Sequence, residues 1–145
     1  MPQKNRFIFP SIKFNNYLCY ANKNSVMKYL YRVADKILQE RLETFGAVLI
    51  EGPKWTGKTT TAEQHAKSCI KMQDPDKADE YLATASAKPS LLLRGEKPKL
   101  IDEWQDAPVL WDAVRTAVDN SGGEPGQYIL TGSNAVDRTK VLLLL

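Results

Sequence analysis

The stretch that most constrains the fold is residues 52–59, Gly-Pro-Lys-Trp-Thr-Gly-Lys-Thr, which directly follows the apolar run at residues 47–50. Its pattern, G-x-x-x-x-G-K-T, lets successive backbone N–H groups turn inward toward one phosphate group. A helix that begins near Lys58 adds unpaired N–H groups and the positive end of its dipole. An ordinary turn with a solvated lysine is the alternative. The position between an apolar strand and a helix favours the phosphate site.

Within this loop, each residue type suggests a role. We expect Lys58 to reach the β- and γ-phosphates of a nucleotide and the Thr59 hydroxyl to hold Mg²⁺. Pro53 has no N–H, so that position cannot donate a hydrogen bond. Trp55 either shields the nucleotide or lies on the surface. The predicted nucleotide-binding residues are Gly52, Pro53, Lys54, Trp55, Thr56, Gly57, Lys58, Thr59 and Thr60.

A second part of the site is predicted at residues 99–103, where an apolar strand ends in Asp102 and is followed by Glu103. Ligands of parallel sheets gather at the carboxyl ends of the strands, so these acids should face the glycine loop. We expect Asp102 to orient the Mg²⁺ ion through its water ligands. Glu103 would act as general base toward the attacking water. The alternative is two acids at the start of a surface loop.

The next apolar strand runs into residues 129–134, Ile-Leu-Thr-Gly-Ser-Asn. A polar side chain here, Ser133 or Asn134, would contact the γ-phosphate or the attacking water. A plain Gly-Ser turn explains the same residues equally well. The catalytic residues predicted from the sequence are therefore Lys58, Glu103 and Ser133.

The rest of the chain alternates between helical and strand patterns. A helix from Val33 is predicted to bury Val33, Ile37, Leu38, Leu42 and Phe45, and Gly46 is predicted to end it with a positive φ. Further helices are expected after the glycine loop, from Asp74-Pro75 onward, and at residues 107–119. Strands are expected at residues 47–50, 69–72, 99–102 and 127–131. This alternation predicts an α/β layer fold with a mostly parallel sheet.

Charge and composition narrow the classes of function. The net charge is +3, but residues 1–34 hold six basic residues and no acidic one, and residues 35–145 hold fourteen basic and seventeen acidic residues. A mildly acidic body argues against a nucleic-acid surface. No apolar run approaches the ~20 residues of a membrane helix, and no signal peptide is evident, so we expect a cytoplasmic protein. Cys19 and Cys69 match no metal or redox spacing.

With these motifs, the chain resembles an AAA-type ATPase. More narrowly, it is similar to bacterial and archaeal AAA-like ATPases that carry a C-terminal domain of unknown function. The resemblance implies a P-loop NTPase three-layer sandwich, ATP and Mg²⁺ as ligands, a metal and water role for Asp102 and Glu103, and a sensor role for Ser133, with Asn134 as second choice. Tyr31 departs from the proline usual in that family, on the adenine side of the site. The segments that carry the resemblance are residues 29–32, 52–60, 73–75, 100–108 and 126–134.

The ends of the chain suggest how it is divided. We expect a poorly ordered N-terminal extension at residues 1–27, a truncated ATPase core at 28–137 and an irregular tail at 138–145. The family's last core strand would be missing, because too few residues precede the apolar run at 141–145 for a parallel crossover. Residues 47–50 would then form an exposed apolar edge. A truncated or frame-disrupted copy of a longer ATPase would fit this pattern, with weak hydrolysis.

The sequence therefore predicts an ATP-binding protein that hydrolyses ATP with Mg²⁺. One alternative is a non-catalytic interaction module that ATP gates. Another is a phosphotransferase in which Glu103 activates a substrate hydroxyl. The predicted partner is a nucleotide, and self-association or a protein partner is compatible with each alternative.

Overall fold

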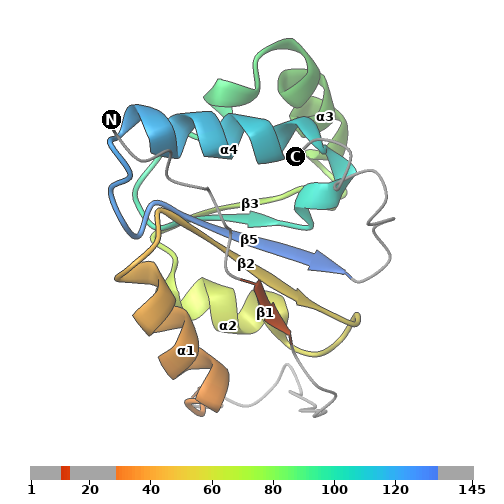
Figure 1. Ribbon diagram of the computed structural model, residues 1–145. Helices are drawn as coiled ribbons and strands as arrows, with labels where there is room; N and C mark the ends of the chain where they lie inside the picture. Colours follow the sequence, from red (N-terminus) through yellow and green to blue (C-terminus); the bar gives the residue numbers. More distant parts are fainter. Residues whose placement is uncertain (1–10, 14–28, 134–145) are drawn as a thin grey trace.

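The computed structural model describes residues 11–13 and 29–133, which form one five-stranded sheet flanked by helices (Figure 1). The strand order is β1-β2-β5-β4-β3, and every neighbouring pair is parallel. The strands are β1 (Ser11–Lys13), β2 (Ala47–Gly52), β3 (Ser68–Lys71), β4 (Lys99–Asp102) and β5 (Tyr128–Ser133). The helices are α1 (Val33–Leu42), α2 (Lys58–His65), α3 (Ala78–Ala87) and α4 (Val109–Asn120), with short 3-10 turns at Pro89–Leu91 and Trp104–Asp106.

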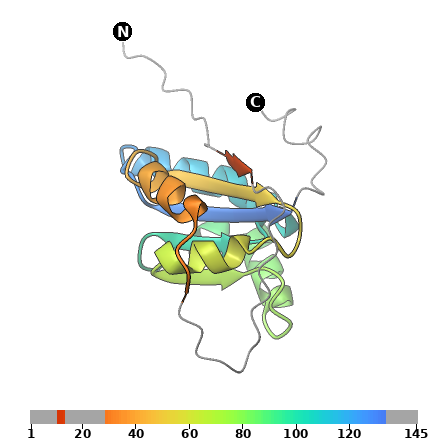
Figure 2. The same ribbon diagram turned by 90° about the horizontal axis from the view of Figure 1, so that it is seen from below.

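The elements are arranged in three layers. Helices α1 and α2 cover one face of the sheet, and α3 and α4 cover the other (Figure 1). Figure 2 looks at the molecule from the side of α1 and α2, with α4 behind the sheet. The predicted α/β architecture with a parallel sheet is confirmed, as expected for a P-loop NTPase.

The core follows the alternation of side chains along the central strands. In β2, Val48 and Ile50 pack with α1 and α2, whereas Ala47 and Leu49 pack with α4 on the opposite face. Because successive side chains of a strand point to opposite faces, a short apolar run can serve two cores at once. In β5, Ile129 joins the first of these clusters, together with Leu38, Leu42, Ala62 and Leu100.

Helix α1 presents a narrower apolar face than its sequence predicts. Leu38 and Leu42 are buried, but Val33 is 81% exposed and Ile37 is 36% exposed. The prediction that all five apolar positions are buried was therefore wrong. Leu38 and Leu42 are four residues apart, so they lie on the same face of α1, and this face packs against the sheet. Val33 lies at the exposed start of the helix.

Two predicted helix boundaries also differ from the structure. Gly46 does not adopt a positive φ; a side chain there would instead lie 2.3 Å from Cγ1 of Val118, so close packing against α4 requires the glycine. Asp74 does not start α3. It forms a turn in which its carbonyl accepts hydrogen bonds from Lys77 N–H and Ala78 N–H, and the helix begins at Ala78.

The expected exposed edge of the sheet is covered in part. Residues Ser11–Lys13 pair in parallel with Leu49–Glu51, so β2 is not an edge strand along this stretch. The sequence prediction of an open edge was wrong because a three-residue strand from the N-terminal segment was not recognised there. The remainder of the predicted extension, at residues 1–10 and 14–27, lies outside the described residues, as do residue 28 and residues 134–145 with Asn134 and the apolar run. The domain boundaries stay predictions.

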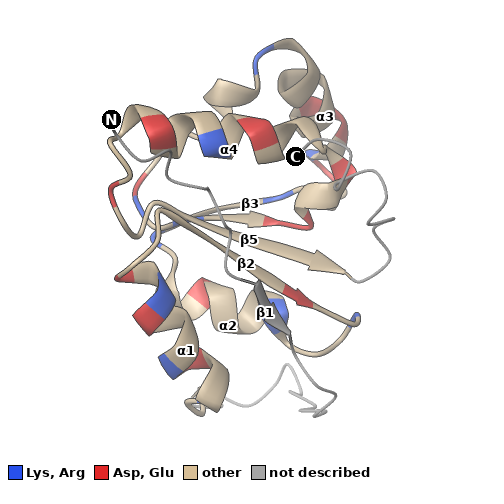
Figure 3. Cartoon of the chain, viewed as in Figure 1, with Lys and Arg blue, Asp and Glu red and all other residues tan. Residues whose placement is uncertain are grey.

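Charged residues of both signs lie together on the outer helices (Figure 3). On α1, the exposed side chains of Lys36, Glu40 and Arg41 lie within two turns. This mixture gives α1 no single-sign face. The absence of a nucleic-acid surface on the body stays a prediction.

The contrast between Leu38 and Val33 gives a direct test of the packing. We expect Leu38→Ala to lower the free energy of unfolding by about 2–5 kcal/mol, because it leaves a cavity under the sheet. The matched variant Val33→Ala removes exposed atoms of the same helix and should change the free energy of unfolding by less than about 0.5 kcal/mol. Urea unfolding of both variants measures the difference. Equal losses would contradict the placement of α1.

Candidate functional site

The glycine loop lies at the carboxyl end of β2 and leads into α2. Gly57, the last residue before the helix, has a φ of 84°, a left-handed conformation that favours glycine. Trp55 has a φ of 68° and its side chain is 92% exposed. Of the two roles considered for Trp55, the structure places its side chain on the surface. Lys54 and Thr60 also have exposed side chains.

Lys58 folds back over the loop. Its ammonium group donates a hydrogen bond to the Pro53 carbonyl at 2.9 Å, and the Thr56 hydroxyl donates to the same oxygen at 2.9 Å. Lys58 is only 4% exposed. Burial lowers the pKa of Lys58 below its ordinary value of 10.5, and the carboxylates of Glu103 and Asp102 oppose this shift. The loop therefore keeps a desolvated amine next to two acids.

The two parts of the predicted site meet at Asp102. The Thr59 hydroxyl donates a hydrogen bond to Oδ1 of Asp102 at 2.6 Å, although the residues are 43 positions apart. The buried Thr131 hydroxyl on β5 donates to the same oxygen at 2.5 Å and accepts a hydrogen bond from Glu103 N–H at 3.1 Å. Thr131 thus links the acidic end of β4 to the strand beside it.

Glu103 is fixed by its backbone and by two side chains. Its φ of 56° is unusual for a residue other than glycine and costs on the order of 1–3 kcal/mol. The Ser133 hydroxyl donates to its carboxylate at 2.8 Å and 3.1 Å, and the Gln105 amide donates a short hydrogen bond to Oε2. Strained residues of this kind cluster at functional sites. In this conformation, the carboxylate of Glu103 lies within hydrogen-bond distance of Ser133 on β5.

The strand order explains why these residues converge. Strand β5 lies between β2 and β4, with Gly52 opposite Ser133 and Ile101 opposite Leu130. Because all three strands run in the same direction, their carboxyl ends lie at one edge of the sheet (Figure 1). The structure thus brings together Lys58, Thr59, Asp102, Glu103 and Ser133, as the sequence analysis expected.

Two neighbours of the acids were missed from the sequence. Thr131 was counted only as part of an apolar strand, although a hydroxyl in a fully buried strand must find a partner. Gln105 lies three residues after Asp102 and two residues after Glu103. This spacing does not predict a contact with the acids unless the turn at Trp104–Asp106 is known. The second choice for the sensor, Asn134, lies outside the described residues.

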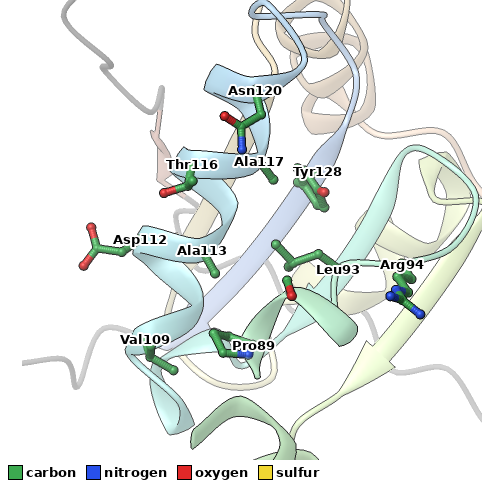
Figure 4. A pocket seen from close by; sticks show the side chains of 11 residues that line it. Pro89, Leu93, Arg94, Val109, Asp112, Ala113, Thr116, Ala117, Asn120 and Tyr128 are labelled. Atoms are coloured by element: carbon green, nitrogen blue, oxygen red, sulfur yellow. The ribbon is translucent and has the colours of Figure 1, made fainter. Parts of the chain in front are cut away.

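A groove of about 570 Å³ lies between α4 and the segment at residues 89–94, and none of the predicted site residues lines it (Figure 4). Its wall includes Leu93, Ala113, Ala117 and Tyr128. Tyr128 is the first residue of β5, whereas the acids gather near the last residues of that strand. The groove is therefore separate from the candidate site.

Comparison with known proteins gives one match. The family model described as "AAA domain" matches residues 44–142. No curated protein and no solved structure matches the chain significantly. Within the described ranges, none of the helices has the length and apolar character needed to cross a membrane. The cytoplasmic location stays a prediction.

The role of Thr131 is testable through stability. We expect Thr131→Val to lower the free energy of unfolding by about 1–3 kcal/mol, because it keeps the shape but removes the buried hydrogen bond to Asp102 and the acceptor of the Glu103 N–H. Thr116→Val, on the exposed face of α4, is the matched control and should stay within about 0.5 kcal/mol of the wild type. Chemical denaturation compares the two. An unchanged Thr131→Val protein would contradict the hydrogen-bond network.

Proposed function

Because the chain belongs to the AAA domain family, whose members are nucleotide-binding proteins of the ATPase type, we propose that it binds ATP with Mg²⁺ and hydrolyses the γ-phosphate. The observation that carries the proposal is the 2.6 Å hydrogen bond from Thr59 to Asp102. It joins the glycine loop directly to the acid at the end of β4. These are the two groups that a magnesium nucleotide needs side by side.

The residues present fit a magnesium ion. A hydroxyl and a carboxylate are the oxygen ligands that Mg²⁺ prefers, and the ion usually takes its other ligands from phosphates and water. We propose that Thr59 and Asp102 hold the ion. When bound, it would neutralise charge on the phosphates.

The loop residues would bind the phosphates. The backbone N–H groups of residues 52–60 (Pro53 excepted) and the start of α2 offer donors and a positive dipole. The Lys58 ammonium would exchange its hydrogen bond with the Pro53 carbonyl for phosphate oxygens. Burial lowers the pKa of Lys58, and the negative charge of an incoming triphosphate would oppose this shift.

Glu103 would accept the proton of the attacking water. Its carboxylate lies beside Ser133 and Gln105, which hold it at the same edge as Thr59 and Asp102. We propose that Ser133 positions Glu103 and reports on the γ-phosphate, which is the sensor role expected from the resemblance. Hydrolysis then proceeds by in-line attack of water, while Lys58 remains protonated to stabilise the charge.

A second candidate function has one observation in its favour. Ser133 and Gln105 both donate hydrogen bonds to the carboxylate of Glu103, so part of its capacity to accept a hydrogen bond from a water is already used in this arrangement. This would suit a module that binds ATP and responds to it without turnover. In the phosphotransferase alternative, Glu103 would instead receive the proton of an acceptor hydroxyl.

Substitution of Glu103 separates these functions. We expect Glu103→Gln to lower the rate of phosphate release by at least about 100-fold, because the amide cannot accept the proton, while Mg·ATP affinity stays within a few-fold of the wild type. Lys58→Ala should instead lose most of the affinity. Glu124→Gln makes the same chemical change on an exposed loop and should alter neither quantity.

Phosphate release and calorimetric titration with Mg·ATP are the two measurements. Binding without release in the wild type would replace the ATPase by the gated module. Consumption of ATP only in the presence of an added hydroxyl acceptor would indicate the phosphotransferase. Full activity in Glu103→Gln would overturn the assignment of the general base.

A further inference from the structure

The segment that precedes α1 lies directly against the glycine loop. A side chain added at Gly57 would place its first carbon 2.3 Å from Nη1 and 3.3 Å from Cζ of Arg32. The guanidinium group of Arg32 therefore occupies the space beside Gly57, at the point where the loop becomes helix α2. Gly57 is constrained twice, by its positive φ and by this close approach.

Arg32 is held there by a buried carboxylate. Asp35 is 0% exposed, and its Oδ2 accepts hydrogen bonds from Arg32 N–H at 2.7 Å and from the Tyr29 hydroxyl at 2.7 Å. The Tyr29 ring lies 5.7 Å from the Arg32 guanidinium carbon, within the range of a cation–π contact. These contacts fix the backbone of Arg32 and support its side chain from one side.

The same carboxylate connects this segment to α2. Nε2 of His65 lies 3.0 Å from Oδ1 of Asp35, and the Tyr29 hydroxyl lies 3.4 Å from the Thr61 hydroxyl. Burial acts to raise the pKa of Asp35, but the hydrogen bonds from Tyr29, Arg32 and His65 outweigh it and lower the pKa below 3.8. Asp35 therefore stays ionised near neutral pH. The position of Arg32 is fixed relative to the helix that begins in the glycine loop.

The charge of Arg32 has no acidic partner in the described part of the chain. The ion pairs formed there involve other residues, and a guanidinium group keeps its proton at any ordinary pH. Arg32 therefore adds a positive charge beside Gly57, at the positive end of the α2 dipole. A positive charge at this position favours the binding of an anion.

We propose that Arg32 is a phosphate ligand of the nucleotide, acting with Lys58 from the opposite side of Gly57. The inference rests on the proposed function and names a residue that the sequence motifs of the loop do not contain. A guanidinium group offers five N–H donors in a planar fork that matches phosphate oxygens. The Asp35 cluster acts through Arg32, since it positions the guanidinium group and does not face the loop itself.

A purely structural role for Arg32 makes a different prediction. If the guanidinium group served only to cover Gly57 and stack on Tyr29, its loss would change stability and leave phosphate affinity unaltered. Phosphate affinity is therefore the readout that separates the two roles. Inorganic tripolyphosphate probes it without a base or ribose.

The test is calorimetric titration of the full chain with Mg·ATP and with Mg·tripolyphosphate. We expect Arg32→Gln, which keeps a long polar side chain, to weaken both ligands by about 10- to 100-fold, as for the loss of a hydrogen bond to a charged group. Arg32→Lys keeps the charge without the fork and should lose less. Arg41→Gln removes the same charge from the far end of α1, where Arg41 stacks on Phe45, and should leave both affinities unchanged.

The possible outcomes distinguish the proposed function from the proposed role of Arg32. If the wild-type protein binds neither ligand, the proposed function and this inference are both wrong. Wild-type binding with unchanged affinity in Arg32→Gln would overturn the inference alone. A loss seen with ATP but not with tripolyphosphate would place Arg32 on the nucleoside, which also contradicts it. If Arg32→Gln fails to fold, as judged by circular dichroism, Arg32→Lys provides the test. Undiminished affinity for both ligands in Arg32→Lys would show that the guanidinium group does not bind the phosphates through its planar set of donors.

Discussion

The site depends on one contact, the hydrogen bond from Thr59 at the start of α2 to Asp102 at the end of β4. It exists because β5 lies between β2 and β4 and all three strands are parallel. A change of strand order or direction would move Asp102 to another part of the sheet. Thr131 on the intervening strand completes the link, since its hydroxyl reaches the same carboxylate oxygen. The register of these three strands therefore determines which side chains meet at the site.

This edge of the sheet concentrates groups that are costly to bury. Lys58, Asp102, Thr131 and Ser133 are all buried, in a molecule whose other buried residues are mostly apolar. Polar groups lose solvation there, so each needs a partner within the protein. Thr131 donates a hydrogen bond to Asp102, whereas Lys58 donates to the Pro53 carbonyl and Ser133 to Glu103. The two apolar clusters on either face of the sheet stabilise the arrangement. A preorganised polar site of this kind can receive a charged ligand with little rearrangement.

The sequence predicted those parts of the fold that local patterns specify. The glycine loop, the strand before it and the acidic end of β4 each have a short, distinctive signature, and the structure places them as expected. The parts that sequence missed depend on contacts between distant segments. The exposure of Val33, the start of α3 at Ala78 and the pairing of Ser11–Lys13 with β2 are of this kind. Arg32 belongs to the same class, since only the fold brings it beside Gly57.

The central claim is that Asp102 and Thr59 form a magnesium-dependent nucleotide site. The most direct measurement is calorimetric titration of ATP into the protein with and without Mg²⁺, for the wild type and for Asp102→Asn. The account predicts that Mg²⁺ tightens ATP binding by at least about 10-fold in the wild type, and that this gain is largely lost in Asp102→Asn. ATP affinity that is indifferent to Mg²⁺ in the wild type, or an equal gain in both proteins, would contradict it.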